Sequence, residues 1–148
     1  MKTELMTQVT NSIFDVMETM FFLTLEKHKD SGPDSQSPDP SAMKAAAITF
    51  SGDVSGTIYL CIPAPLLQTM TENLMGQDID TLTPEHVDGT LKEALNMIAG
   101  GAMTRIDDTA YMGLGIPEIV PVPGSGDIDE TVMLNTSRDI LVAHIKLN

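Results

Sequence analysis

The sequence is poor in basic residues and in cysteine. Its 148 residues include 8 Lys and Arg against 21 Asp and Glu, a formal net charge of −13 at pH 7. Because nucleic acids and anionic membranes bind basic surfaces, this balance excludes the nucleic-acid-binding and membrane-surface classes. The single cysteine, Cys61, cannot form an internal disulfide. No apolar stretch of signal-peptide length follows the first residue, so we expect a reducing, cytoplasmic setting.

Long apolar runs and common catalytic motifs are also missing. The densest apolar run, residues 20–25, is too short to span a bilayer, so we expect no membrane insertion. The glycines match no phosphate-binding or dinucleotide-binding pattern. Cys61 lies within a predicted strand and is interpreted as a buried, inert thiol. The histidines lack metal-ligand spacing, and an acidic turn near the C-terminus is interpreted as solvated, so no metal site is predicted: His28, His86, His144, and the acidic residues Asp127, Asp129 and Glu130.

The composition predicts one globular domain over residues 1–148. Hydrophobic residues make up 42% and charged residues 20%, which is typical of a folded chain of this length. Apolar residues at helical spacing predict an amphipathic helix from about Thr3 to Lys27, with Phe21 and Leu25 on its apolar face. The segment from residue 28 to about 42 is rich in Pro, Ser and Asp and predicts a flexible loop.

The rest of the chain predicts two hairpins and two further helices. Short apolar runs at 45–50 and 57–62, joined by a turn containing Gly and Asp, predict a hairpin. Pro63 and Pro65 open a helix that Gly76 ends, and Thr83 caps a longer helix reaching about Ile106. An irregular strand is expected at 119–122 and a closing hairpin over 130–135 and 140–147. This order predicts an α+β fold, an antiparallel β-sheet with two or three helices packed on one face.

The polar side of the long helix is the candidate functional surface. At about 100° per residue, Glu93, Asn96 and Gly100 cluster opposite an apolar stripe that runs from Leu91. Gly100 and Gly101 each cost about 1 kcal/mol relative to Ala inside a helix. Bare backbone there admits close approach of another protein or of a packed element of the same chain. A solvated face with tolerated glycines is the alternative.

The motif in this helix resembles a known family. Residues 93–100, with Glu93 and Asn96 three apart and Gly100 following, are similar to the E-x-x-N helix of the CheX and CheC phosphatases of bacterial chemotaxis. Residues 50–52 and 56–60 resemble the strand–turn–strand of that family, and Pro117 falls near a family proline. The resemblance runs from about Ser12 to the C-terminus. Gly89 stands where the CheC pattern has Asp or Ser, the interval from Asn96 to Pro117 is slightly short, and the helix occurs once, which favours the CheX type.

The resemblance implies a phosphatase that removes the phosphoryl group from the aspartate of a CheY-type response regulator. Asn96 would hold a water in line with the phosphorus, and Glu93 would pair with a lysine of the receiver domain. Met97, Gly100 and Gly101 would contact the partner. No cofactor of its own is implied, because the divalent cation, Mg²⁺, would belong to the receiver. A homodimer is also implied by the family.

Two other functions remain open at this stage. A non-catalytic module of the same fold could bind or sequester a response regulator or a flagellar-switch component through the same helix face. The 11 methionines also raise the possibility of a Met-rich groove for a partner helix. Most of them lie at core spacing, so core filling is the preferred interpretation.

Overall fold

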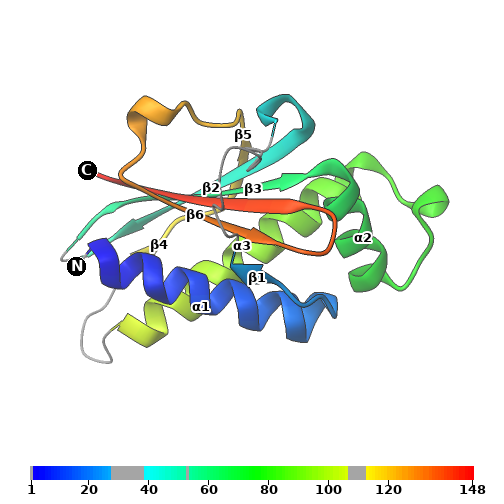
Figure 1. The fold of residues 1–148 in the computed structure, drawn as a ribbon, viewed down its shortest axis with the longest axis horizontal. Helices are drawn as coiled ribbons and strands as arrows, with labels where there is room; N and C mark the ends of the chain where they lie inside the picture. The colour runs from blue at the N-terminus through cyan, green and yellow to red at the C-terminus, as the bar shows by residue number, and fades with distance from the viewer. Residues whose placement is uncertain (1, 28–38, 53, 107–112) are drawn as a thin grey trace.

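The fold is one antiparallel sheet with three helices packed on one face (Figure 1). The computed structural model describes residues 2–27, 39–52, 54–106 and 113–148. The seven strands have the order β1-β6-β7-β3-β2-β4, and β5 also pairs with β2. The predicted α+β architecture is confirmed. The elements in chain order are α1 (Lys2–Phe21), β1 (Glu26–Lys27), η1 (Pro40–Ala42), β2 (Met43–Ser51), β3 (Gly56–Pro63), α2 (Ala64–Met75), η2 (Ile79–Thr81), α3 (Pro84–Ile106), β4 (Gly113–Leu114), β5 (Glu118–Val120), η3 (Ser125–Asp127), β6 (Glu130–Asn135) and β7 (Ile140–Leu147).

Helix α1 is shorter than predicted. It ends at Phe21, and Phe22 has a φ of 58°, in the left-handed region that turns the chain out of a helix. The N–H of Leu23 donates to the carbonyl of Met17 at 2.9 Å, which closes this end. The helix predicted to reach Lys27 is therefore wrong over its last six residues. Glu26 and Lys27 instead form β1, which pairs with β6 at the edge of the sheet.

The loop predicted from residue 28 to about 42 is only partly described. Residues 28–38 lie outside the described residues. Pro40–Ala42 form a short 3-10 helix, and the side chain of Asp39 accepts a hydrogen bond from the N–H of Ser41 at 3.0 Å. The hydroxyl of Ser41 also donates to this carboxylate, at 2.9 Å, and the two hydrogen bonds lower the pKa of Asp39. The end of the predicted loop is thus a capped turn leading into β2.

The first hairpin and the second helix form where they were predicted. Strands β2 and β3 pair over eight residues, and the register places Thr49 opposite Thr57. A Cβ at Gly56 would lie 2.2 Å from the carbonyl oxygen of Lys146, so β3 and β7 can approach here only without a side chain. Helix α2 ends at Gly76, whose φ of 66° supplies the left-handed cap.

The C-terminal half completes the sheet around β7. The predicted closing hairpin is confirmed, with β6 and β7 at the predicted bounds, and β7 lies between β6 and β3. The strand expected at 119–122 forms as β5 over Glu118–Val120 and pairs with β2. The two-residue β4 has no periodicity to signal it, and it was missed in the sequence.

The two faces of the sheet are covered differently. The helix side holds the main core, to which α1, α2 and α3 all contribute. The other side carries a small apolar cluster of Ala45, Cys61 and Val142. Burial raises the pKa of the Cys61 thiol to about 11, in agreement with the prediction of a buried, inert thiol. Among the described helices, none combines the length and the hydropathy needed to cross a membrane.

Candidate functional site: the exposed face of helix α3

The start of α3 is fixed by a reciprocal cap. The Thr83 hydroxyl accepts from the N–H of His86 at 3.3 Å, and the Nδ1 of His86 accepts from the N–H of Thr83 at 3.0 Å. Pro84 occupies the first helical position, as predicted. Hydrogen bonds from its own backbone N–H and from Thr83 lower the pKa of Glu85, an anion at the positive end of the helix dipole. The helix therefore begins at a defined residue, which sets the direction of every later side chain.

One face of α3 is buried against the sheet and the other two helices. Leu91, Leu95, Ile98 and Ala102 are at most 1% exposed, as the predicted stripe requires. On the opposite side, Glu93 and Asn96 are both exposed, and Met97 and Gly100 are half-buried. From residue 89 onward, the exposed and half-buried positions of α3 are Gly89, Lys92, Glu93, Asn96, Met97, Gly100, Gly101, Thr104, Arg105 and Ile106. The structure thus brings Glu93 and Asn96 together on one open surface, three residues apart on the helix.

Bare backbone lies on both sides of Asn96 along this face. A Cβ at Gly89 or at Gly100 would meet no atom within 4 Å. Gly89 is the position at which the CheC pattern has Asp or Ser. Another protein surface can therefore approach the α3 backbone one turn beyond Asn96 and two turns before it. The exposed side chains and the open space at the two glycines fit a macromolecular partner.

Gly101 has a different role from its neighbour. A Cβ there would lie 2.5 Å from the Oγ of Ser12 in α1. That hydroxyl is buried and donates to the carbonyl of Ile98 at 2.7 Å, so α1 and α3 meet at this point. The missing side chain at Gly101 is explained by packing within the chain. Of the two glycines predicted to contact a partner, Gly100 is the one that faces open space.

Two ion pairs hold α3 against the rest of the fold. Lys44 of β2 pairs with Asp88 near the start of the helix, and Arg105 near its end pairs with Asp15 of α1. Asp88 is the acidic residue next to Gly89, and its carboxylate is engaged by the sheet. Sequence reasoning missed Ser12, Lys44 and Asp15, because their partners are 44 to 90 residues away and no local pattern connects them.

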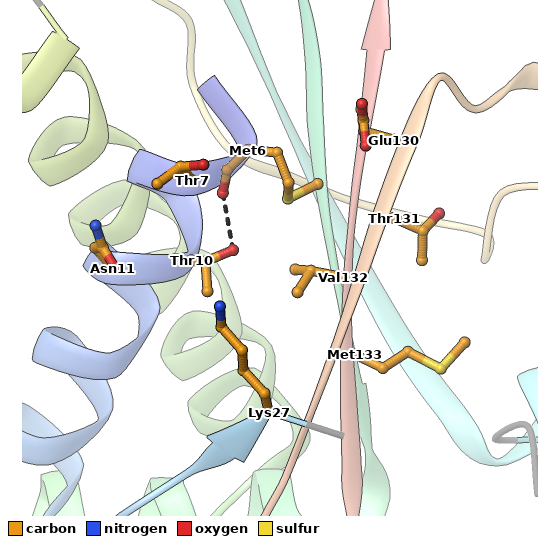
Figure 2. A pocket seen from close by; sticks show the side chains of 9 residues that line it. All are labelled: Met6, Thr7, Thr10, Asn11, Lys27, Glu130, Thr131, Val132 and Met133. Atoms are coloured by element: carbon orange, nitrogen blue, oxygen red, sulfur yellow. Dashed lines mark hydrogen bonds between the residues drawn. The ribbon is translucent and has the colours of Figure 1, made fainter. Parts of the chain in front are cut away.

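A pocket among the described residues lies away from this face. Figure 2 shows it between α1 and β6, lined by nine residues: Met6, Thr7, Thr10, Asn11, Lys27, Glu130, Thr131, Val132 and Met133. Thr10 turns its hydroxyl back to the carbonyl of Met6, at 2.8 Å. None of the predicted site residues lines this pocket, although small-molecule sites are usually concave. Glu93 and Asn96 therefore lie on an exposed face of α3, outside this pocket.

The two described histidines, His86 and His144, lie on different elements and have different partners. His86 belongs to the α3 cap, and the Nδ1 of His144 on β7 lies 2.8 Å from the Thr131 hydroxyl, while His28 is outside the described residues. Burial lowers the pKa of His144. In the acidic turn near the C-terminus, the carboxylate of Asp129 accepts from the N–H of Leu147 at 2.7 Å. Over the described ranges, no group of three His, Cys, Asp or Glu side chains could hold a metal ion.

Comparison with known proteins identifies the family and the fold. A family model described as "Chemotaxis phosphatase CheX" matches residues 45–141, which is more than half of the chain and includes all of α3. A search of curated proteins found no match. Solved structures share the fold at low identity, and they cover nearly the whole chain.

Three of these structures indicate the range of the fold. The chemotaxis protein CheX from Vibrio vulnificus has a TM-score of 0.77 at 19% identity, covering 97% of this chain and 96% of its own. CheX in a CheX–CheY–BeF3–Mg complex from Borrelia burgdorferi has a TM-score of 0.70 at 17% identity, covering 97% of each chain. FliY from Thermotoga maritima has a TM-score of 0.60 at 13% identity, covering 93% of this chain and 84% of its own. Because the family model matches residues 45–141, this chain belongs to the CheX family of chemotaxis phosphatases.

Proposed function

We propose that this protein hydrolyses the phosphoryl-aspartate of a CheY-type response regulator in the cytoplasm. The observation that carries the proposal is the joint exposure of Glu93 and Asn96 on one face of α3, in a member of the CheX family. The absence of any Cβ contact at Gly100 adds room for the receiver one turn further along. The Borrelia burgdorferi structure, a complex of CheX with CheY, supports this class of partner.

In the proposed reaction Asn96 acts by positioning. Water attacks the phosphorus, and the bond from phosphorus to the receiver's aspartate oxygen breaks, which yields inorganic phosphate and the free carboxylate. The carboxamide of Asn96 both accepts and donates hydrogen bonds, so it can orient a water in line with the leaving oxygen. Most catalysis of phosphoryl transfer consists of such positioning and of electrostatic stabilisation.

Glu93 fixes the register of the two proteins in this proposal. Its exposed carboxylate lies one helical turn from Asn96 and is free to pair with a lysine beside the phosphoryl group of the receiver. The divalent cation, Mg²⁺, belongs to the receiver. This assignment is supported by the site, because the exposed face of α3 around Asn96 offers one carboxylate rather than a cluster of ligands.

The decay of a phosphorylated CheY-type receiver, with and without this protein, tests the proposal. We expect faster decay with the wild type and none of this acceleration with Asn96→Ala or Glu93→Ala. Asn11→Ala and Glu18→Ala, at exposed positions of α1, remove the same groups elsewhere and should leave the acceleration intact. Unchanged decay with the wild type would refute the phosphatase proposal.

A non-catalytic module that binds or sequesters a response regulator or flagellar-switch component is the second candidate. It is favoured by the Gly at position 89, where the CheC pattern has Asp or Ser. Under this alternative, Asn96→Ala would have little consequence for either decay or binding. Measuring receiver binding beside decay therefore separates the two functions.

A homodimer is the oligomeric state we propose. Strand β1 covers only Leu134 and Asn135 of β6, so in the described sheet the first four residues of β6 lack an outer strand partner. Such an edge can pair with a second chain. Light scattering coupled to size-exclusion chromatography should give twice the monomer mass, and a monomer at high protein concentration would refute this state.

A further inference from the structure

A lysine stands beside Asn96 on the candidate face. Lys92 precedes Asn96 by four residues, one turn of α3, so the two side chains are neighbours on the helix surface. At 100° per residue, Lys92 and Glu93 lie on opposite sides of Asn96. Lys92 is half-buried, while Glu93 and Asn96 are exposed. Asn96 is therefore bracketed by one positive and one negative side chain.

Within the part of the chain that the structure describes, Lys92 forms no ion pair with another element. Two ion pairs form among the described residues, and they engage Lys44 and Arg105. The acidic neighbour one turn before Lys92 is Asp88, whose carboxylate contacts Lys44 of β2. Arg105, near the end of α3, forms an ion pair with Asp15. The ammonium of Lys92 can therefore turn toward whatever docks on Asn96.

The overall charge makes a cation at this place informative. The chain carries −13, and a receiver pocket that holds a phosphoryl-aspartate is itself acidic, so long-range repulsion opposes their encounter. A single cation at the contact point can offset part of this repulsion at short range. A lysine is also a common ligand for phosphate oxygens.

We propose that Lys92 is a substrate-binding residue that draws the anionic rim of the phosphorylated receiver pocket onto α3. The proposal rests on the function proposed above. Lys92 contributes binding and orientation, and Asn96 retains its role in placing the water. Lys92 would then face the acidic rim of the receiver pocket, and Glu93 would face the basic residue inside it. Because the two charges lie on opposite sides of Asn96, they set a single docking orientation.

Three lysine variants test this role against a general effect of charge. Lys92→Gln removes the charge, Lys92→Arg keeps it, and Lys146→Gln removes one charge from β7, on a residue that faces away from the helices. Lys92→Gln and Lys146→Gln give the same net charge. The assays are the rate of receiver dephosphorylation against receiver concentration, and binding to a receiver loaded with beryllium fluoride and Mg²⁺.

We expect Lys92→Gln to raise KM and Kd by about threefold to tenfold, the range for a partly exposed charge pair up to a charge-assisted hydrogen bond, with kcat nearly unchanged. The rate with Lys92→Gln should also rise more steeply with salt, because one attractive contact is lost and the repulsion that salt screens is less offset. Lys92→Arg should restore both constants, and Lys146→Gln should match the wild type.

The outcomes separate this proposal from the phosphatase function. Equal effects of Lys92→Gln and Lys146→Gln on KM and Kd would overturn the role of Lys92, even in an active enzyme. Weaker binding with Lys92→Gln alone would support it, even if the wild type binds the receiver without dephosphorylating it. A wild-type protein that neither binds nor dephosphorylates the receiver would overturn both proposals.

Discussion

The substitution of Gly101 by Ala tests whether α1 and α3 meet as the structure shows. The new Cβ would lie 2.5 Å from the Oγ of Ser12, well inside the contact distance of carbon and oxygen. Ser12 must then rotate away from the carbonyl of Ile98, to which it donates at 2.7 Å. Because Ser12 is 1% exposed, its hydroxyl would lose this partner in a buried place.

The expected magnitude follows from two opposing terms. Leaving a buried hydroxyl without its hydrogen bond costs about 1–3 kcal/mol. Replacing Gly by Ala inside a helix gains about 1 kcal/mol from helix propensity. We therefore expect Gly101→Ala to lower the free energy of unfolding by about 1 kcal/mol, the difference between the two terms.

Gly100→Ala is the matched control, since it changes the adjacent residue of the same helix and meets no atom within 4 Å. It should raise the free energy of unfolding by up to about 1 kcal/mol, so the two variants should differ by roughly 2 kcal/mol. Urea unfolding followed by circular dichroism at an unchanged m-value measures this difference. Adding Ser12→Ala should cost less in the Gly101→Ala background than in the wild type, a coupling that a double-mutant cycle reports. Equal stability of the two glycine variants would refute the close approach of α1 to α3.

Three further predictions concern the site and the core. Gly100→Ala, although stabilising, should slow receiver dephosphorylation several-fold, because its Cβ enters the space left for the partner beside Asn96; a rate equal to that of the wild type would show that the partner does not approach this residue. Raising the salt concentration from low to physiological should leave dephosphorylation unchanged or faster, because salt screens the repulsion between two acidic proteins, and a steep loss of rate would contradict the proposed interface. Cys61 should resist thiol reagents in the native state at pH 8 and react after unfolding. Since burial raises its pKa from 9.0 to about 11, Cys61 should also contribute stability that is complete below pH 9 and lost as the pH rises from 9 to 11, which pH-dependent unfolding of wild type and Cys61→Ala would measure.

The end of α1 shows where sequence periodicity misleads. Leu25 continues the helical spacing of Phe21, and it is indeed buried, at 5% exposure. The helix nevertheless stops, because Phe22 takes a left-handed conformation and the chain turns to pair β1 with β6. Two apolar residues at helical spacing indicate that both are buried. They do not require that one continuous helix contain both of them. The pairing with β6 depends on residues more than a hundred positions away.

The two glycines of α3 show the same limit within the site. The sequence places both on the helix and indicates that something needs the room, yet it does not say which neighbour uses it. Gly101 faces Ser12 and Gly100 faces open space, although the two are adjacent in the chain. Only the crossing of α1 over α3 distinguishes them.

The sequence alone determined three features of α3. These are the face shared by Glu93 and Asn96, the buried stripe that runs from Leu91, and the cap at Thr83. These features depend on the helical repeat and on local hydrogen bonds, which act within a few residues. The tertiary structure decided what holds that helix: Ser12 against Ile98, Lys44 against Asp88, and Asp15 against Arg105. It also left Lys92 outside these ion pairs, beside Asn96. Such contacts join side chains that are distant in sequence, so they are fixed only when the sheet and the helices pack together.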